Sequence, residues 1–558
     1  MHAAFSADPA IVSTSSSVTL WTGPSGFLLS KYQIGSTVLR RNEPRSHSRQ
    51  AQPDRIHMNQ TQTELPSSDT GSGPRYKHVL ALNPYTMDSM GSMGIFPPTG
   101  LEYVVTNMKP LVGKVTLVDL RTEKEYADFD KLCEFIRKDV DLICIAIMWR
   151  SRFEQVCKLI SRLPPEVTTI VGGQTATEEV EYLFQRCSNI DMIVRGEGEN
   201  IIQQIVSGTP LPEIDGLSYR QNGTAVHNKN GVLPEVAGLS FPDRSLRRYD
   251  YKWMENGVRL SDHTFDTILG ARGCPYKCKF CTFNMNPLGQ KREYTERPLE
   301  SVVAELKSIT ADVVLFSDDH FFINPRRSGE LCDLIIANGI KKTFIVQTRI
   351  EVTRHPDLLK KAFQAGVRIL LVGIESPHDR ILEQFDKGFT QKQVREAFAI
   401  FGTFDFYIHG YFIYGNVTET EEEMVYIGQF GREIGVDSIG FQKLRIEKFC
   451  PLQKLVESTP GYHYDRIGGP VYSDKYGLPE LKKIRNRIRA AFYTRSQIRR
   501  MYQKLHRHGL LGPKDILRVL SHLPVLAYNM RQRKIRKRNP ELPAPLCASS
   551  PNPETGDK

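Results

Sequence analysis

Short apolar runs that alternate with stretches of helical periodicity are the feature that most constrains the fold of this chain. Between Lys77 and residue 210 these runs are HVLALNP, KVTLVDL, DLICIAIM, TTIVGG and IDMIVRGEGE. Both odd-numbered and even-numbered positions of these runs are mostly apolar, as expected for parallel strands that helices cover on both faces. Segments such as FDKLCEFIRKD (129–139) have helical periodicity and lie between the runs. We therefore predict an α/β fold with a doubly wound parallel sheet, Rossmann-like or flavodoxin-like, over residues 76–210.

A second series of the same kind begins at FDTILGARG (265–273). It continues through ADVVLFSDD, KKTFIVQTR, GVRILLVGIES, FYIHGYFIYG and VDSIGFQKL. Strands that alternate regularly with helices over residues 265–450 favour a partial TIM barrel of the (β/α)6 type over another open sheet. Residues 211–264 lack a helical period and contain Asn-Gly pairs that indicate turns, so they are predicted to be a connector.

The two ends of the chain depart from this pattern. Residues 1–75 are rich in Ser, Thr, Pro, Gln and Arg, which predicts a disordered extension, and translation from Met58 is an alternative start. Residues 451–538 are predicted to be a helical, basic C-terminal region, and residues 539–558 a disordered tail. There is no signal-peptide layout and no apolar stretch of about 18 residues, so we expect a cytoplasmic protein.

The positive charge of the chain raises the question of its partners. The formal net charge is +11, but the basic residues are scattered apart from one C-terminal run, and no nucleic-acid-binding module accompanies them. We therefore expect no nucleic acid partner. The segment ILRVLSHLPVLAYNM followed by RQRKIRKR favours a helix docked on the barrel with a solvated tail. The alternative is peripheral contact with an anionic membrane, which would suit a lipid-like substrate.

Three of the ten cysteines lie close together in GARGCPYKCKFCTF. Cys274, Cys278 and Cys281 have a C-x3-C-x2-C spacing directly after a predicted strand, and Gly273 and Pro275 prevent the backbone from continuing as strand or helix. Thiolates at this spacing on a loop can converge on one four-iron cluster and leave one iron open. Structural zinc needs four protein ligands, and no fourth Cys or His has finger or ribbon spacing here. Zinc and buried cysteines without a chemical role are the remaining alternatives.

This motif, with the aromatic Phe280 before the last cysteine, resembles the defining motif of the radical S-adenosylmethionine (SAM) superfamily. The resemblance implies a 4Fe-4S cluster on the three cysteines. The open iron would bind the amino and carboxylate groups of SAM, and an electron from the cluster would cleave SAM into methionine and a 5′-deoxyadenosyl radical. It further implies an electron donor such as ferredoxin or flavodoxin.

The resemblance extends to the ends of the later strands, where the family contacts SAM. The candidate SAM-binding residues are Phe280, Asp318, Asp319, Gln347, Arg349, Glu375 and Tyr414. By resemblance the two aspartates would contact the methionine moiety, Gln347, Arg349 and Glu375 the ribose and carboxylate, and the segment of Tyr414 would back the adenine. Polar residues at the carboxyl ends of barrel strands converge on one mouth. The alternative is that they only cap strand ends and helix starts.

The segments IVGGQTAT and IDMIVRGEGENII resemble the cobalamin-binding domain that precedes the radical domain in one branch of the superfamily. The candidate cobalamin-binding residues are Gly172, Gly173, Gln174, Glu197 and Trp149. Glycines after a strand permit close approach of a large ligand, although a tight turn explains them equally well. Trp149 would stack on the corrin or cover apolar surface.

The chain departs from this branch in one respect. It contains no D-x-H-x-x-G motif, so no histidine is evidently placed to bind cobalt. We favour cobalamin bound without a protein axial ligand over a domain that has kept its fold and lost the cofactor.

These patterns together predict an enzyme that starts radical chemistry on an unactivated carbon of a small-molecule or lipid-like substrate. The leading hypothesis is cobalamin-dependent C-methylation. Radical cyclisation, oxidation or carbon-carbon coupling without methyl transfer is the alternative reaction, since fold does not determine chemistry. A non-catalytic cobalamin or redox sensor is the alternative of another class.

Overall fold

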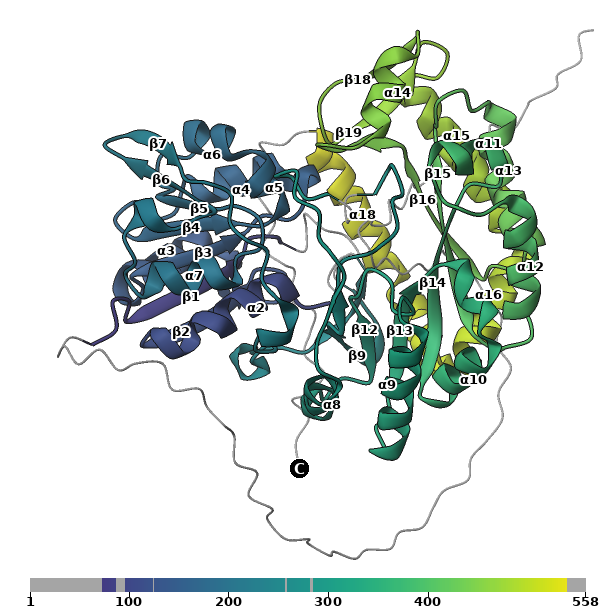
Figure 1. The fold of residues 1–558 in the computed structure, drawn as a ribbon, viewed down its shortest axis with the longest axis horizontal. Coiled ribbons are helices and arrows are strands. Elements are labelled where there is room, and N and C mark those ends of the chain that lie inside the picture. The colour runs from purple at the N-terminus through teal and green to yellow at the C-terminus, as the bar shows by residue number, and fades with distance from the viewer. Residues whose placement is uncertain (1–72, 87–95, 124, 256–257, 282–284, 539–558) are drawn as a thin grey trace, which may run out of the picture.

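The computed structural model describes residues 73–86, 96–123, 125–255, 258–281 and 285–538. The predicted disordered ends and the alternative start at Met58 lie outside these residues, except for residues 73–75. Two α/β units stand beside each other, the N-terminal one at the left of Figure 1 and the second at the right. The predicted α/β class is therefore confirmed. No helix in the described part of the chain is long and apolar enough to cross a bilayer.

The N-terminal unit is a seven-stranded sheet in the order β2-β1-β3-β4-β5-β6-β7. Its first five strands are parallel, and β6 and β7 add to its edge in antiparallel orientation. The strands are β1 (His78–Asn83), β2 (Lys114–Asp119), β3 (Leu142–Ala146), β4 (Thr168–Gly172), β5 (Met192–Val194), β6 (Leu217–Gln221) and β7 (Thr224–His227). The helices are α2 (Thr99–Met108), α3 (Phe129–Asp139), α4 (Phe153–Ile160), α5 (Gln174–Glu178), α6 (Val180–Arg186) and α7 (Glu199–Val206).

The antiparallel hairpin β6-β7 comes from the predicted connector. Its turn is Asn222-Gly223, and both residues have positive φ, 50° and 80°. This is the conformation that tight two-residue hairpins require, and Asn-Gly is the pair that adopts it most readily. The turn was predicted from the sequence, whereas the joining of the hairpin to the parallel sheet was not.

The second unit is an open half-barrel with the strand order β16-β15-β14-β13-β12-β9-β8. Within this sheet β9, β12, β13, β14, β15 and β16 are parallel, and β8 pairs with β9 in antiparallel orientation at one edge. The strands are β8 (Tyr251–Glu255), β9 (Val258–Ile268), β12 (Val313–Phe316), β13 (Thr343–Thr348), β14 (Val367–Glu375), β15 (Tyr407–Tyr414) and β16 (Ser438–Lys443). The helices are α8 (Leu299–Ser308), α9 (Pro325–Ala337), α10 (Pro356–Gln364), α11 (Asp379–Gln384), α12 (Gln391–Phe401) and α13 (Glu421–Glu433).

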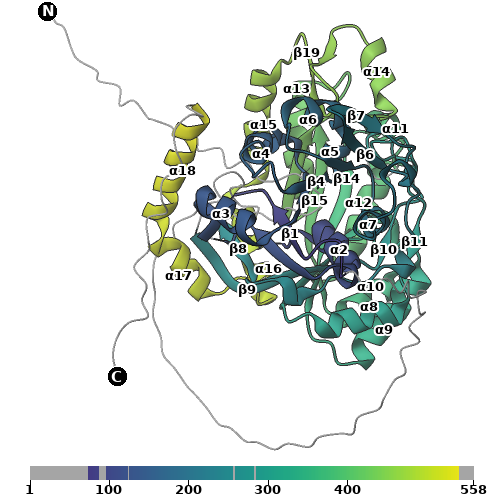
Figure 2. The same cartoon turned by 90° about the vertical axis from the view of Figure 1, so that its left-hand side faces the viewer.

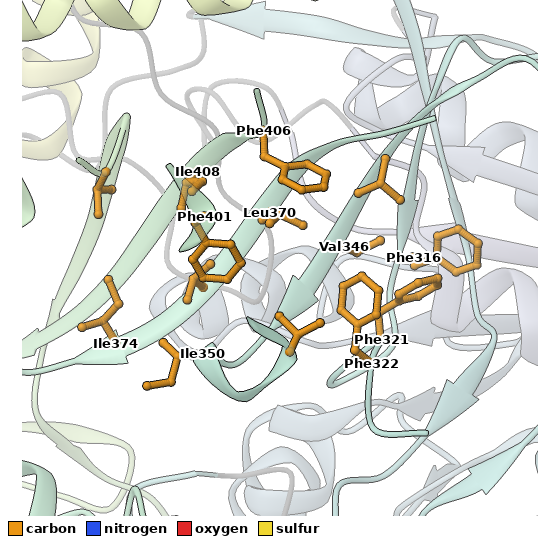
Figure 3. Close-up of a cluster of buried hydrophobic side chains, with 14 of the residues drawn as sticks. Phe316, Phe321, Phe322, Val346, Ile350, Leu370, Ile374, Phe401, Phe406 and Ile408 are labelled. Atoms are coloured by element: carbon orange, nitrogen blue, oxygen red, sulfur yellow. The ribbon is translucent and has the colours of Figure 1, made fainter. Parts of the chain in front are cut away.

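The main core of the half-barrel lies between its strands and the helices outside them. Figure 3 shows side chains of four neighbouring strands and of α12 in this layer, among them Phe316, Val346, Leu370, Ile408 and Phe401. A capping box begins α13, in which Thr420 and Glu423 each accept a hydrogen bond from the other's backbone N–H. Strand burial and helix capping thus agree with the alternating pattern of the sequence.

The C-terminal region contains strands as well as the helices that were predicted. It comprises β17 (Arg445–Ile446), α14 (Leu452–Ser458), β18 (Tyr462–Tyr464), β19 (Gly469–Ser473), α15 (Leu478–Phe492), α16 (Arg495–Arg507), α17 (Pro513–Ser521) and α18 (Leu523–Arg538). The strands form a small antiparallel sheet above the half-barrel (Figure 1). The helices α17 and α18 lie along the side of the molecule in Figure 2, where Leu526 is buried and Leu517, Val525 and Tyr528 are exposed.

Candidate functional site

The cysteine loop, residues 273–281, follows the first strand of the half-barrel. After β9, the short strand β10 (Ala271–Arg272) pairs with β11 (Thr295–Glu296), and the chain then bends at Gly273. Gly273 has a φ of +91°, and a Cβ atom there would lie 2.3 Å from the carbonyl oxygen of Glu293. Only glycine can make this bend. It places Cys274 directly beyond the carboxyl end of a parallel strand, where barrel enzymes carry their chemistry.

None of the three cysteines of this loop forms a disulfide bond with another described residue. Cys278 is buried, while Cys274 and Cys281 are half-buried. Burial raises the pKa of Cys274, and the neighbouring charges of Asp319 and Cys278 raise it further. In the described ranges, no three His, Cys, Asp or Glu side chains lie close enough together to hold one metal ion. In an iron-sulfur cluster each thiolate binds a different iron, so the cysteines need not meet at one point. Soft sulfur donors on one bent loop fit such a cluster.

Arg349, just beyond β13, contacts the cysteine loop. Its Nη1 lies 3.2 Å from the Sγ of Cys278, and its guanidinium stacks over the ring of Tyr276 at 3.8 Å. Glu351 and the carbonyl oxygen of Lys387 accept its other hydrogen bonds. The sequence placed Arg349 near SAM, and the structure places it against the sulfur of a cysteine.

Glu375, at the end of β14, lies beside Lys387 in the same part of the site. Glu375 has a φ of +70°, which is strained for a residue with a side chain, and the pairing of β14 with β15 shifts register there. Its Oε1 lies 3.3 Å from the Nζ of Lys387, and both side chains are buried. Phe280 lies close to Lys387, whose Nζ is 5.7 Å from the centre of its ring. The sequence had singled out Phe280 and Glu375 but missed Lys387.

Asp318 and Asp319, which follow β12, accept hydrogen bonds from the backbone that leads into the cysteine loop. Asp318 accepts one from Gly270 N at 2.6 Å, and Asp319 accepts one from Gly273 N at 2.9 Å. Burial raises the pKa of Asp318 to about 7 and that of Asp319 to about 6. In the structure both carboxyl groups thus position the backbone before Cys274.

The remaining barrel candidates lie on neighbouring strands. The side chain of Gln347 donates to the carbonyl oxygen of Asp318 at 3.2 Å. Tyr414, at the end of β15, is buried, and burial raises its pKa to about 12. His320, which the sequence did not single out, is buried and stacks on Tyr276 with 5.9 Å between ring centres. Burial, followed by the charge of Arg349, lowers the pKa of His320 to about 3, so its imidazole is neutral.

The glycine candidates of the N-terminal unit form a tight turn at the carboxyl end of β4. Gly173 has a φ of +100°, and a Cβ there would lie 2.8 Å from the carbonyl oxygen of Ile147. A Cβ on Gly172 would meet only Val194 at ordinary contact distance. Gln174 begins α5 and is exposed. The turn therefore accounts for Gly173, whereas Gly172 leaves room at the sheet edge.

Trp149 lies at the same edge, beyond β3. Its ring centre is 4.4 Å from that of Tyr85, whose hydroxyl accepts hydrogen bonds from the backbone of Met148 and Trp149. Met148 beside it is 46% exposed. These apolar side chains and Gly172 suit a flat ring at the carboxyl edge, where open α/β sheets bind ligands.

Glu197 joins the two units. Its carboxylate lies 2.6 Å from Arg272 Nη1 and 3.4 Å from Arg292 Nε, and Glu199 lies 2.9 Å from Arg272 Nη2. Arg272 directly precedes the bend at Gly273. The GEGE segment, predicted as part of a cobalamin site, thus contacts the base of the cysteine loop.

Comparison with known proteins agrees with this geometry. Residues 268–430, which run from the end of β9 into α13, match the Radical SAM superfamily. This segment is a radical SAM domain. It contains the three cysteines and every barrel candidate named above, and its match begins just before the cysteine loop.

Relatives of the radical SAM domain align over more of the chain. An uncharacterised methyltransferase of Pyrococcus horikoshii is 25% identical over 72% of this chain and 89% of its own length. The anaerobic magnesium-protoporphyrin IX monomethyl ester cyclase of Cereibacter sphaeroides is 25% identical over 67% of this chain, but the match spans only 62% of that protein. The radical SAM methyltransferase TsrM of Kitasatospora setae, solved with cobalamin and a [4Fe-4S] cluster, has a TM-score of 0.57 at 16% identity over 83% of this chain and 100% of its own. That likeness is one of fold.

Proposed function

We propose that this chain is a radical SAM enzyme that methylates an unactivated carbon with the help of cobalamin. The observation that carries the proposal is the cysteine loop, which presents three cysteines outside any described disulfide beyond the first strand of a half-barrel. Cys274, Cys278 and Cys281 would hold a 4Fe-4S cluster, which supplies the electron for reductive cleavage of SAM. An external reductant is required, and we propose ferredoxin or flavodoxin for it.

The residues around the loop divide into two groups. Asp318, Asp319 and Arg349 hold the loop or its sulfur in place, so we propose that they position the cluster. Glu375, whose backbone is strained, and Lys387 form a buried pair, and we propose that they bind polar groups of SAM. Strain of this kind persists where the surrounding structure enforces it, which is common at ligand sites. Gln347 and Tyr414 complete the proposed SAM site.

We propose that cobalamin binds at the carboxyl edge of the N-terminal sheet, beside Gly172 and Trp149. In this arrangement, contact of Glu197 with Arg272 keeps that edge in a fixed relation to the cysteine loop. Cobalamin would supply a carrier for the methyl group. We propose a cobalamin-type unit of 76–210 and a radical SAM unit of 265–450, joined by a connector of 211–264 that adds β6 and β7 to the first sheet and β8 to the second. Peripheral membrane contact of the basic C-terminal segment stays an untested alternative.

Radical cyclisation or oxidation without methyl transfer is the second candidate. The cyclase of Cereibacter sphaeroides favours it, since its identity to this chain equals that of the methyltransferase relative. The same radical domain can serve either reaction.

One experiment distinguishes these candidates. Anaerobically reconstituted protein is given reductant, cobalamin, SAM labelled on its methyl group, and a cell extract as a source of substrates. We expect 5′-deoxyadenosine together with label in a product. Formation of 5′-deoxyadenosine without transferred label would support the second candidate, and absence of both would refute radical SAM chemistry. Omission of cobalamin is the control, and label transfer without it would contradict the cobalamin-dependent mechanism.

The contact of Arg349 with Cys278 gives a separate prediction. We expect Arg349→Gln to lower the midpoint potential of the cluster by on the order of 50 to 100 mV, because it removes a charged hydrogen-bond donor from a ligating sulfur. A redox titration followed by electron paramagnetic resonance measures the shift. Arg354→Gln, an exposed arginine nearby, is the matched control. An unchanged potential in Arg349→Gln would show that Arg349 does not act on the cluster.

A further inference from the structure

A group of cationic side chains lies at the carboxyl end of β16, the edge strand of the half-barrel. Lys443 is the last residue of β16 and is in register with Tyr414 on β15. Arg485 and Arg489 lie one turn apart on α15, flanking its buried face. A Cβ on Gly415 would touch Leu481, so α15 packs directly beyond Tyr414. We call Lys443, Arg485 and Arg489 the cationic cluster, and all three are half-buried.

The charges of the cationic cluster repel one another. Burial lowers the pKa of Lys443, and the charges of Arg485 and Arg445 lower it further. The pKa of Arg489 is lowered by burial and by Arg485, against the opposing effect of Tyr493. A nearby carboxylate would shift the pKa of Lys443 upward. Lys443 and Arg485 therefore hold positive charge that no neighbouring carboxylate neutralises in the described part of the chain.

Contacts in the described part of the chain also indicate that the positive charge of Lys443 and Arg485 has no carboxylate partner. Neither Lys443 nor Arg485 has a carboxylate oxygen within 4.0 Å there. The Nε of Arg485 is buried and has no hydrogen-bond partner among the described residues. Glu447, which follows β17, interacts instead with Arg445 and with Arg150 of the N-terminal unit. A buried N–H donor without a partner is costly, and a ligand that accepts its hydrogen bond would remove this cost.

We propose that the cationic cluster binds an oxyanion, the phosphate or carboxylate group of the substrate. This inference rests on the proposed function and names a chemical feature of the molecule that the enzyme acts on. Arginine presents parallel N–H donors that match the oxygens of both groups, and lysine adds a point charge. The cluster adjoins Tyr414, at the same carboxyl ends of the strands as the cysteine loop. A substrate anchored here would extend from the edge strand toward the radical site.

The reactivity of Lys443 tests binding directly. Full-length, reconstituted protein is treated with an acetylating N-hydroxysuccinimide ester at neutral pH, and modification of each lysine is followed by peptide mass spectrometry. Only the neutral amine reacts, so a bound anion that raises the pKa of Lys443 slows its modification. We expect inorganic pyrophosphate or succinate to slow it about tenfold relative to chloride at equal ionic strength. If pyrophosphate slows the modification more, the bound group is a phosphate, and if succinate does, it is a carboxylate.

Two results would overturn the inference. Lack of protection by either anion would show that the cationic cluster binds no oxyanion. Equal protection by SAM alone would assign the cluster to the carboxylate of SAM instead of the substrate. Exposed Lys482 and Lys483 report on nonspecific effects in the same samples.

Variants connect the site to turnover. We expect Arg485→Gln to lose the protection of Lys443 and to raise, by about tenfold, the amount of extract needed for half-maximal label transfer. Lys483→Gln, on the exposed face of the same helix, should leave both unchanged. Label transfer by Arg485→Gln equal to that of the wild type would refute the substrate assignment. Failure of the wild type to form 5′-deoxyadenosine would instead refute the proposed function, so the two failures are distinguishable.

Discussion

Alanine at Cys274, Cys278 or Cys281 is expected to abolish the iron-sulfur absorption of the reconstituted protein and its cleavage of SAM. Each substitution removes one of the three proposed thiolate ligands. The bend at Gly273 fixes the path of the loop, so we expect no other side chain to take the place of the missing thiolate. Loss of an outer-shell partner already costs roughly 10- to 100-fold in metal affinity or activity, and loss of a ligand should cost more. Iron content, visible absorption and 5′-deoxyadenosine formation measure the effect.

Cys332→Ala is the matched control for these variants. Cys332 is a free thiol on α9, fully buried in the core of the half-barrel. Its loss should destabilise the protein by about 1 kcal/mol and leave the cluster intact. Retention of iron by Cys278→Ala, or its loss from Cys332→Ala, would contradict the assignment of the cluster to the cysteine loop.

The cysteine loop could be recognised from the sequence because its determinants are local. The three cysteines, the glycine at the bend and the preceding strand lie within one short segment, and the spacing of the cysteines indicates an iron-sulfur cluster. The parallel strands could also be predicted from the sequence. Both faces of each strand are buried, so the residues that point to either face are apolar.

Other parts of the site depend on contacts between distant segments. Lys387 and Arg272 carry no local signal, and they become functional candidates only because Glu375 and Glu197 lie opposite them. The aspartates at the end of β12 were predicted to contact SAM, and the sequence could not show that they accept hydrogen bonds from the backbone of residues 270 and 273. Similarly, β18 and β19 are short, and helical segments on either side obscure their period.

Buried ion pairs between the connector and the half-barrel lead to the second prediction with a large effect, a loss of stability when Glu305 is replaced. Glu305 on α8 is 0% exposed, and it accepts hydrogen bonds from Arg297 and from Arg244 of the connector. Arg244 also lies 2.7 Å from Asp266, which in turn pairs with Arg247. The connector is thus held to β9 and α8 by buried charges, and through Arg247 to Glu102 of the N-terminal unit.

We expect Glu305→Ala to lower the free energy of unfolding by about 3 to 5 kcal/mol, because two buried guanidinium groups lose their shared counter-charge. Urea denaturation followed by circular dichroism measures it. Glu396→Ala removes the exposed partner of Lys392 at 3.9 Å and should cost no more than about 0.5 kcal/mol. Glu305→Gln keeps the volume of the side chain and separates loss of charge from formation of a cavity. A loss below about 1 kcal/mol in Glu305→Ala would show that water or Asp266 compensates Arg244 and Arg297, and that the connector is not held by this carboxylate.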